Sequence, residues 1–168
     1  MNTTTHIQET LQNVYEKYKD VRDGEVATYI PELAKAKPDD FGICLATVDG
    51  QVFSVGDWQQ EFTIQSICKP FAFLMALEEF GRDAVLEKVC VEPSGDAFNA
   101  IELEPRTMRP FNPMINAGAI AIASMIKKSS RDCGVRAYVQ KMELAAGRTL
   151  QIDHAVLVSE SATGNRNR

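Results

Sequence analysis

The chain has 168 residues, of which 45% are hydrophobic and 24% are charged, and its formal net charge is −5. This length and composition are typical of a globular domain with its own hydrophobic core. The net negative charge argues against nucleic acid or an anionic membrane as the main partner, and no apolar run reaches the length that spans a membrane.

The cysteines and histidines predict neither disulfides nor a metal site. The cysteines are Cys44, Cys68, Cys90 and Cys133, and none of them forms a CxxC pair. We expect free, buried thiols in a reducing cytosol and therefore a cytoplasmic protein. The N-terminus has neither the basic start nor the apolar core of a signal peptide. Only 2 histidines are present, so we expect no structural metal site.

Helical periodicity recurs along most of the chain. The first predicted helix is amphipathic, and the threonines before it are candidate caps. The helix at 115–126 is apolar on all sides, which predicts that it is buried. The predicted helices cover 6–18, 32–37, 69–80, 82–89, 115–126 and 132–146.

Two runs of apolar, often β-branched residues, 41–48 and 51–55, flank the Asp-Gly dipeptide at 49–50. This pattern predicts an antiparallel hairpin with a type I′ turn. Residues 61–64 predict a third strand, and residues 93–113 predict a long structured loop of the kind that is often functional. Together the elements predict an α+β protein with antiparallel strands and a helical cluster.

The last apolar segment begins at His154 and passes into a polar end. We expect no closing strand or capped helix after this segment, and no later strand that covers the edge of the predicted sheet. The chain therefore looks cut short at its C-terminus, and the family resemblance given below implies that residues 1–168 are the N-terminal portion of a single catalytic domain.

A serine and a lysine one helical turn apart, Ser66 and Lys69, are candidate catalytic residues. A free serine is a weak nucleophile, and an amine kept neutral by burial can take its proton. Ser66 also precedes the helix at 69–80, where unpaired N–H groups stabilise a developing oxyanion. The same spacing recurs at Ser124 and Lys127, where the serine would be a packing residue, and Ser66 has the alternative of an ordinary helix cap.

Four blocks of sequence carry a resemblance to a known family. They are Gln65-Ser-Ile-Cys-Lys-Pro-Phe71, Glu92-Pro-Ser-Gly-Asp-Ala-Phe-Asn99, Arg109-Pro-Phe-Asn-Pro-Met-Ile-Asn-Ala-Gly-Ala119 and Ser159-Glu-Ser-Ala-Thr-Gly-Asn-Arg-Asn167. In order from about Tyr29 to the end, the chain resembles the serine-dependent glutaminases. The resemblance implies an incomplete β-lactamase/transpeptidase-like fold. It also implies hydrolysis of L-glutamine to L-glutamate and ammonia through a γ-glutamyl ester on serine.

The resemblance implies a role for individual residues. Ser66 is the expected nucleophile and Lys69 its base. The expected substrate-binding residues are Tyr29, Ser66, Asn116, Glu160 and Asn167. A carboxylate suits the α-ammonium of glutamine, and neutral donors suit its carboxylate and amide. The structural alternatives are a helix cap for Asn116, a first-turn position for Glu160, a core position for Tyr29 and a solvated tail for Asn167.

The resemblance also implies that no metal or organic cofactor is needed, and we expect a homo-oligomer. Complete relatives are about twice as long and contribute further pocket tyrosines and a second oxyanion-hole amide, so we expect this chain alone to be nearly inactive. Two alternatives stay open: another acyl-serine enzyme such as a β-lactamase or peptidase, and a fragment that only associates with a partner. The Ser-Asp-Asn and Lys-Thr-Gly motifs of the β-lactamases are absent, which counts against the first alternative.

Overall fold

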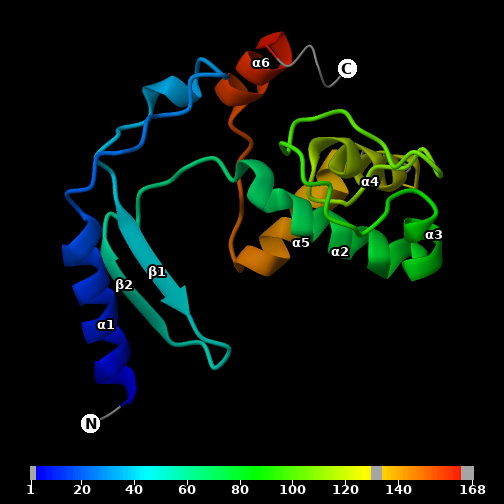
Figure 1. Cartoon of the computed structure of the whole chain (residues 1–168). Helices are drawn as coiled ribbons and strands as arrows, with labels where there is room; N and C mark the ends of the chain where they lie inside the picture. Colours follow the sequence, from blue (N-terminus) through cyan, green and yellow to red (C-terminus); the bar gives the residue numbers. More distant parts are fainter. Residues whose placement is uncertain (1–2, 130–133, 164–168) are drawn as a thin grey trace. The chain divides into compact units, whose positions relative to one another are not determined.

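The computed structural model describes residues 3–129 and 134–163. The chain divides into two compact units (Figure 1). Unit 1 comprises Met1–Thr63 and Asp153–Gly164, and unit 2 comprises Ile64–Ile152 and Asn165–Arg168. Helices and an antiparallel pair of strands confirm the α+β class. That the whole chain is part of a single catalytic domain stays a prediction.

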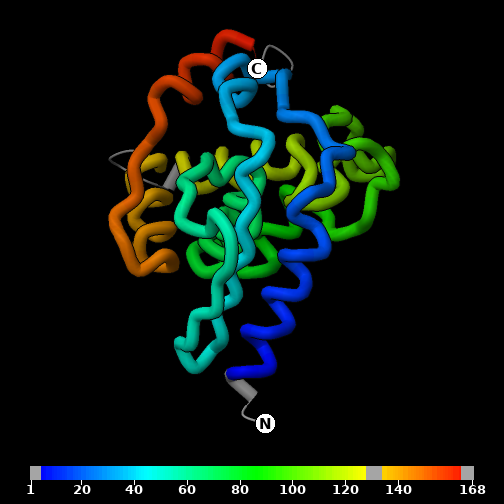
Figure 2. Tube along the Cα trace, turned by 90° about the vertical axis from the view of Figure 1, so that its left-hand side faces the viewer, coloured from blue at the N-terminus to red at the C-terminus, as the bar shows by residue number. Residues whose placement is uncertain are grey.

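Unit 1 is built on a β-hairpin with a helix against one of its faces (Figure 2). Its elements are α1 (Thr3–Tyr18), η1 (Leu33–Lys35), β1 (Gly42–Ala46), β2 (Val52–Gly56) and α6 (His154–Thr163). Helix α1 begins earlier than predicted, so the threonines expected as caps lie in its first turn. The periodicity was sufficient to place the helix because one apolar stripe packs on the hairpin. The buried residues of this core are Leu11, Phe53 and Val55.

The hairpin is confirmed, but the type I′ turn is wrong. The N–H of Gly50 donates to the carbonyl of Thr47 at 3.0 Å, and the N–H of Thr47 donates to the carbonyl of Gln51 at 2.9 Å. The loop between these paired residues is thus longer than a two-residue turn. Gly50 has a φ of 86°, whereas Asp49 is not among the residues with positive φ. A type I′ turn requires positive φ at both central residues, and the Asp49 side chain instead accepts a hydrogen bond from the Thr47 hydroxyl.

The predicted third strand at 61–64 is absent. Among the described residues the sheet has only the pair β1 and β2, and residues 60–64 are irregular. Phe62 is 79% exposed. The apolar, β-branched composition is compatible with a strand, but a strand also needs pairing with a neighbouring strand, and these residues do not join the sheet of β1 and β2.

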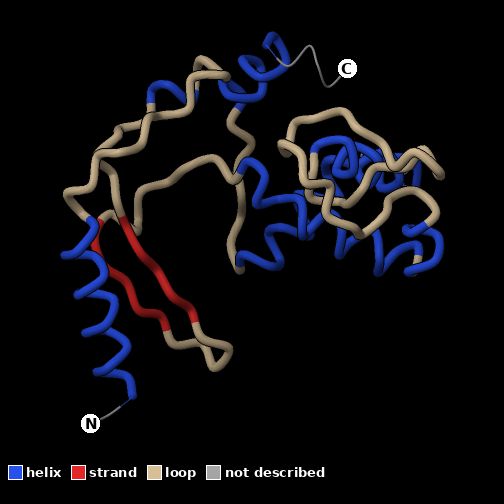
Figure 3. Tube along the Cα trace, in the orientation of Figure 1, coloured by secondary structure: helices blue, strands red, loops and turns tan. Residues whose placement is uncertain are grey.

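Unit 2 is a helical cluster with one long loop, drawn in tan between α3 and α4 (Figure 3). Its elements are η2 (Gln65–Ile67), α2 (Cys68–Phe80), α3 (Arg82–Leu86), α4 (Asn116–Ser129) and α5 (Gly134–Ala146). The core consists of Ala76, Val85, Val89, Ile122 and Ile126. The loop is ordered by backbone hydrogen bonds, as predicted: the N–H of Cys90 donates to Pro110 O, and the N–H of Glu92 donates to Phe111 O, each at 2.9 Å.

Helix α4 is buried on one face only. Ile122 and Ile126 are 1% and 3% exposed, but Ile120 is 48% exposed, and Ser124 is exposed as well. The prediction of a helix buried on all sides is therefore wrong for the described part of the chain. Apolar composition shows that a helix can be buried, but the elements packed against it decide which of its faces are buried.

The last apolar segment, from His154 onward, forms the capped helix α6, which was not among the predicted helices. Asp153 Oδ1 accepts the N–H of Val156 at 3.0 Å, and its carbonyl accepts the N–H of Leu157 at 3.0 Å. An aspartate in this position is a standard N-cap, so α6 has a clear start that the sequence analysis missed.

The described cysteines are free, as predicted, but they are not buried. Cys44 is exposed, while Cys68 and Cys90 are partly exposed; Cys133 lies outside the described residues. Within residues 3–129 and 134–163, no helix combines the length and apolarity needed to cross a membrane.

Candidate active site

Ser66 lies in η2, directly before the first turn of α2, and is exposed. The residue that begins α2 as its N-cap is Ile67, and no side chain caps the helix there. The alternative that Ser66 is an ordinary helix cap is therefore wrong. The hydroxyl is presented to solvent at a helix start, which is a suitable place for a nucleophile.

The residue before Ser66 has an unusual backbone conformation. Gln65 has a φ of 45°, and Met108 is the other non-glycine residue with positive φ in the described chain. Such a conformation costs roughly 1–3 kcal/mol and concentrates at functional sites. The strained residue therefore lies directly before Ser66, where the chain enters η2 and α2.

Lys69, one turn after Ser66, is buried, with an exposed fraction of 9%. Its Nζ donates to the backbone carbonyl of Met114 at 2.9 Å and to Oδ1 of Asn116 at 2.8 Å. Nζ also lies 5.8 Å from the centroid of the Phe98 ring. Residues from the long loop and from the start of α4 thus surround the amine.

Burial lowers the pKa of the Lys69 amine from its ordinary value of 10.5. A charged group loses hydration when it is buried, so the neutral form gains. The sequence predicted this direction. A neutral amine has two N–H donors and one lone pair. In the neutral form, if both donors bond Met114 O and Asn116 Oδ1, the lone pair is left to accept a proton.

Asn116 is the first residue of α4, but its side chain does not cap that helix. The first helical hydrogen bond runs from the N–H of Ala119 to the carbonyl of Ile115. The N–H of Asn116 donates to the carbonyl of Phe98 at 2.9 Å, and its Oδ1 accepts from Lys69. The cap alternative is wrong, and the amide Nδ2 keeps two donors for another partner.

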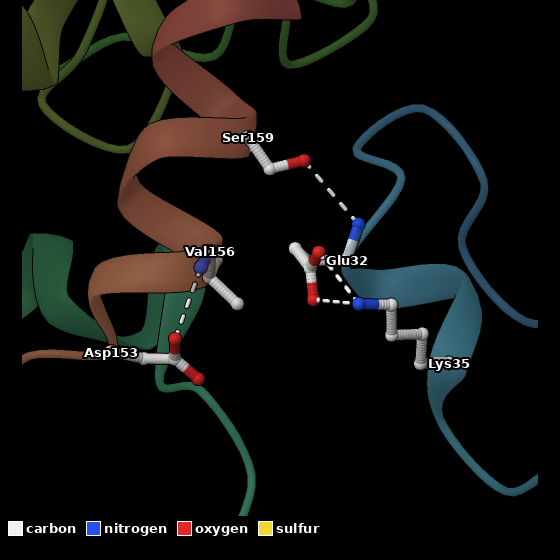
Figure 4. Close-up of polar contacts among 5 residues, drawn as sticks. All are labelled: Glu32, Lys35, Asp153, Val156 and Ser159. Atoms are coloured by element: carbon white, nitrogen blue, oxygen red, sulfur yellow. Dashed lines mark hydrogen bonds and ion pairs between the residues drawn. The ribbon is translucent and has the colours of Figure 1, made fainter.

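Tyr29 and Glu160 belong to unit 1. Tyr29 is 65% exposed, so it is not a core residue in the described chain. Glu160 is exposed and lies beyond the first turn of α6, which excludes its alternative as a first-turn dipole partner. Their two segments meet where the N–H of Glu32 donates to Oγ of Ser159 at 3.3 Å (Figure 4).

The structure therefore gathers the predicted site residues in two groups. Unit 2 holds Ser66, Lys69 and Asn116, and unit 1 holds Tyr29 and Glu160 on neighbouring segments. Asn167 lies outside the described residues. Within those residues no cluster of histidine, cysteine, aspartate and glutamate side chains could hold a metal ion.

Three contributors to the site were not identified from the sequence: Met114, Phe98 and Asn112. Met114 acts through its carbonyl, which gives no sequence signal. Asn112 Oδ1 accepts the N–H groups of Met114 and Ile115. This arrangement is an Asx turn. The sequence signal that could have suggested the turn is the asparagine at position 112, two residues before Met114.

The chain was compared with known proteins. The family model described as Glutaminase matches residues 24–168. The glutaminase of Nostoc sp. is 51% identical over 158 residues, which are 94% of this chain and 47% of that protein. The crystal structure of Mglu in its glutamate form is 44% identical, with a TM-score of 0.88 over 96% of this chain and 38% of that chain. The structure of the probable glutaminase YbaS is 30% identical, with a TM-score of 0.92 over 99% of this chain and 54% of that chain.

This chain belongs to the glutaminase family. The resemblance found in the sequence blocks is confirmed, and so is the α+β fold of the β-lactamase-like glutaminases. The chain spans about half the length of the curated glutaminases that it matches, at 47% for the Nostoc protein. The roles of the individual residues stay predictions.

Proposed function

We propose that this protein hydrolyses L-glutamine to L-glutamate and ammonia, with Ser66 as nucleophile and Lys69 as general base. The observation that carries the proposal is the buried Lys69 one turn after an exposed serine, with its N–H groups directed at Met114 O and Asn116 Oδ1. Family membership supports the reaction, and the related protein Mglu has a crystal structure in its glutamate form, glutamate being the product of that reaction.

In the first half-reaction, Ser66 Oγ attacks the γ-carboxamide carbon while the neutral Lys69 amine takes the hydroxyl proton. The carbonyl oxygen becomes an oxyanion near the backbone N–H of Ser66 at the helix start. Lys69 then gives the proton to the amide nitrogen. The C–N bond breaks, ammonia leaves, and a γ-glutamyl ester remains on Ser66.

In the second half-reaction, water attacks the ester carbon and Lys69 takes the proton of the water. The bond between Ser66 Oγ and the carbonyl carbon breaks, and Lys69 returns the proton to Oγ. Glutamate leaves and the starting state is restored. Glutamine and water are consumed and glutamate and ammonia are formed, so no redox or group-carrying cofactor is required.

Substrate recognition is assigned to Asn116, Glu160, Tyr29 and Asn167, each taken by itself. The free Nδ2 of Asn116 offers donors to the substrate. Glu160 carries the charge that complements an α-ammonium group. Exposed Tyr29 and, by resemblance, Asn167 complete the set. Asn116 therefore serves both the base and the substrate, while Glu160 serves recognition alone.

The test uses the form of the protein that releases ammonia from glutamine, whether this 168-residue chain or a longer form that contains it. Ser66→Ala should abolish release, by at least about 10⁴-fold if the covalent route is lost. The matched control is Ser124→Ala. Ser124 is also exposed, and it precedes Lys127 by the same spacing that separates Ser66 from Lys69. Activity that survives Ser66→Ala but is lost in Ser124→Ala would contradict the assignment.

The rival assignment to another acyl-serine enzyme is tested with the same protein. Turnover of a chromogenic β-lactam without turnover of glutamine would favour it. A protein that turns over neither substrate, yet binds a partner chain, would favour a purely associative role.

We also propose a cytoplasmic homo-oligomer. Large exposed apolar side chains, such as Phe62 at 79% and Leu144 at 77%, support association. Sedimentation of the purified protein measures its mass directly, and a monomer at all concentrations would contradict this proposal.

A further inference from the structure

The carbonyl of Met114 is aimed at Lys69 by the peptide group to which it belongs. The Met114 carbonyl and the N–H of Ile115 are parts of one planar peptide, and the described chain has no cis peptide bond. In a trans peptide these two groups point in opposite directions. The N–H of Ile115 donates to Oδ1 of Asn112 at 3.1 Å, while the carbonyl accepts from Lys69 Nζ at 2.9 Å.

Asn112 holds this peptide from several directions. Its Oδ1 also accepts the N–H of Met114, at 3.0 Å. Because both partners are donors, the amide oxygen must face them, and Nδ2 faces the carbonyl of Glu92 at 2.9 Å. The backbone carbonyl of Asn112 lies against Gly118 of α4, where a Cβ would come within 1.9 Å of it. Asn112 is thus fixed to the long loop on one side and to α4 on the other.

We propose that Asn112 is a positioning residue for the reaction: by orienting the Met114–Ile115 peptide, it fixes the direction in which the Lys69 amine presents its lone pair. This inference rests on the proposed role of Lys69 as base. A neutral amine can rotate about its Cε–Nζ bond, and two fixed acceptors stop that rotation. With Asn112 shortened, the Met114 carbonyl is free to turn away, and water reaches Lys69.

The first readout is catalysis by Asn112→Ala in the active form of the protein. A misdirected base should lower kcat by roughly 10- to 100-fold. KM should stay nearly unchanged, because the Asn112 amide is bonded to the backbone of Glu92, Met114 and Ile115 and is not assigned to substrate binding. Water around Lys69 weakens the effect of burial. The pKa of the amine should therefore rise toward 10.5, and the rise of kcat/KM with pH should move to higher pH.

The second readout does not depend on activity. In the 168-residue chain with ¹³C-labelled lysine, the Cε signal of Lys69 is assigned by its loss in Lys69→Arg and then titrated. Its midpoint should be higher in Asn112→Ala than in the wild type. Asn112→Ser keeps a neutral oxygen that can accept the same N–H groups, though more weakly, so its midpoint and kcat should lie between the two.

The control is Val85→Ala, which removes methyl groups from a fully buried residue of the unit 2 core. It should lower the unfolding temperature without moving the Lys69 midpoint or the pH profile. If Asn112→Ala does not fold, Asn112→Ser decides the question. A Lys69 midpoint that is the same in the wild type and in the folded Asn112 variants would overturn the inference, whatever happens to kcat. If the wild type releases no ammonia but the Lys69 midpoint is higher in the Asn112 variants than in the wild type, the proposed function is wrong. The positioning of Lys69 by Asn112 is then still supported.

Discussion

The two groups of predicted site residues differ in how far the protein fixes them. In unit 2, Lys69 is 9% exposed and its Nζ has two acceptors within 2.9 Å. In unit 1, Tyr29 is 65% exposed and Glu160 is exposed on α6. Lys69, the proposed base, is thus buried and hydrogen-bonded without a ligand, whereas Tyr29 and Glu160, proposed for recognition, are exposed.

This difference corresponds to the tasks of the two groups. A general base must have the right protonation state and direction before reaction, and both come from burial and hydrogen bonds. A side chain that recognises a ligand can form its contacts when the ligand binds. Changes at Lys69 should therefore act mainly on kcat, and changes at Glu160 or Tyr29 mainly on KM.

The largest effect is expected for Lys69. Lys69→Arg keeps a positive charge but cannot lose its proton at ordinary pH. We expect it to be as inactive as Lys69→Ala, with kcat lowered by roughly 10²–10⁴-fold. Steady-state ammonia release by the two variants measures this. An active arginine variant would show that Lys69 acts only as a fixed charge, and the contrast between the two units would lose its basis.

The pH dependence of the wild type belongs to the same test. The amine must be neutral to act as base, and its pKa is lowered from 10.5 by burial. Activity should therefore rise as pH rises through this lowered pKa. A rate that falls over the same interval, with the protein still folded, would contradict a neutral lysine base.

A smaller effect is expected for Glu160. Glu160→Gln keeps the size and hydrogen bonding of the side chain but removes its charge. Loss of a charge-assisted hydrogen bond to the α-ammonium should raise KM for glutamine by roughly 10- to 100-fold and change kcat much less. The matched control is Glu9→Gln on the exposed side of α1, which should change neither constant. An equal KM for wild type and Glu160→Gln would remove Glu160 from the recognition group.

The smallest effect concerns stability. The folded chain disfavours the charged form of Lys69, so between its lowered pKa and 10.5 the unfolded chain binds more protons than the folded one. Stability conferred by this group therefore rises with pH across that interval. Compared with Lys69→Met, which does not titrate, the wild type should gain a few degrees in unfolding temperature, on the order of 2–4 °C per kcal/mol. If the unfolding temperatures of the wild type and Lys69→Met change in parallel with pH, Lys69 is not desolvated in the folded protein.

Local patterns in the sequence were enough to place most helices. The starts of α2 and α4 differ from their predicted positions by only one residue each. These helices could be placed because the helical spacing of apolar residues is a property of the segment itself. The hairpin was found for the same reason. Its turn type was not, because the side chain of Asp49 bonds to Thr47 and draws the loop into another conformation.

Ser66 and Lys69 were also identified from the sequence, since their spacing and the blocks around them are local features. That spacing equally fits Ser124 and Lys127, and the structure separates the pairs: Lys69 is buried and hydrogen-bonded, whereas Lys127 is exposed. What only the tertiary structure decided is the environment of the base. Lys69 meets Met114 and Asn116 across a separation of more than 40 residues, and Asn112 directs the Met114 peptide toward it. These contacts join a backbone carbonyl, an amide and a buried amine from distant segments, and no local pattern records them, because burial and hydrogen-bond direction arise only when the segments pack together.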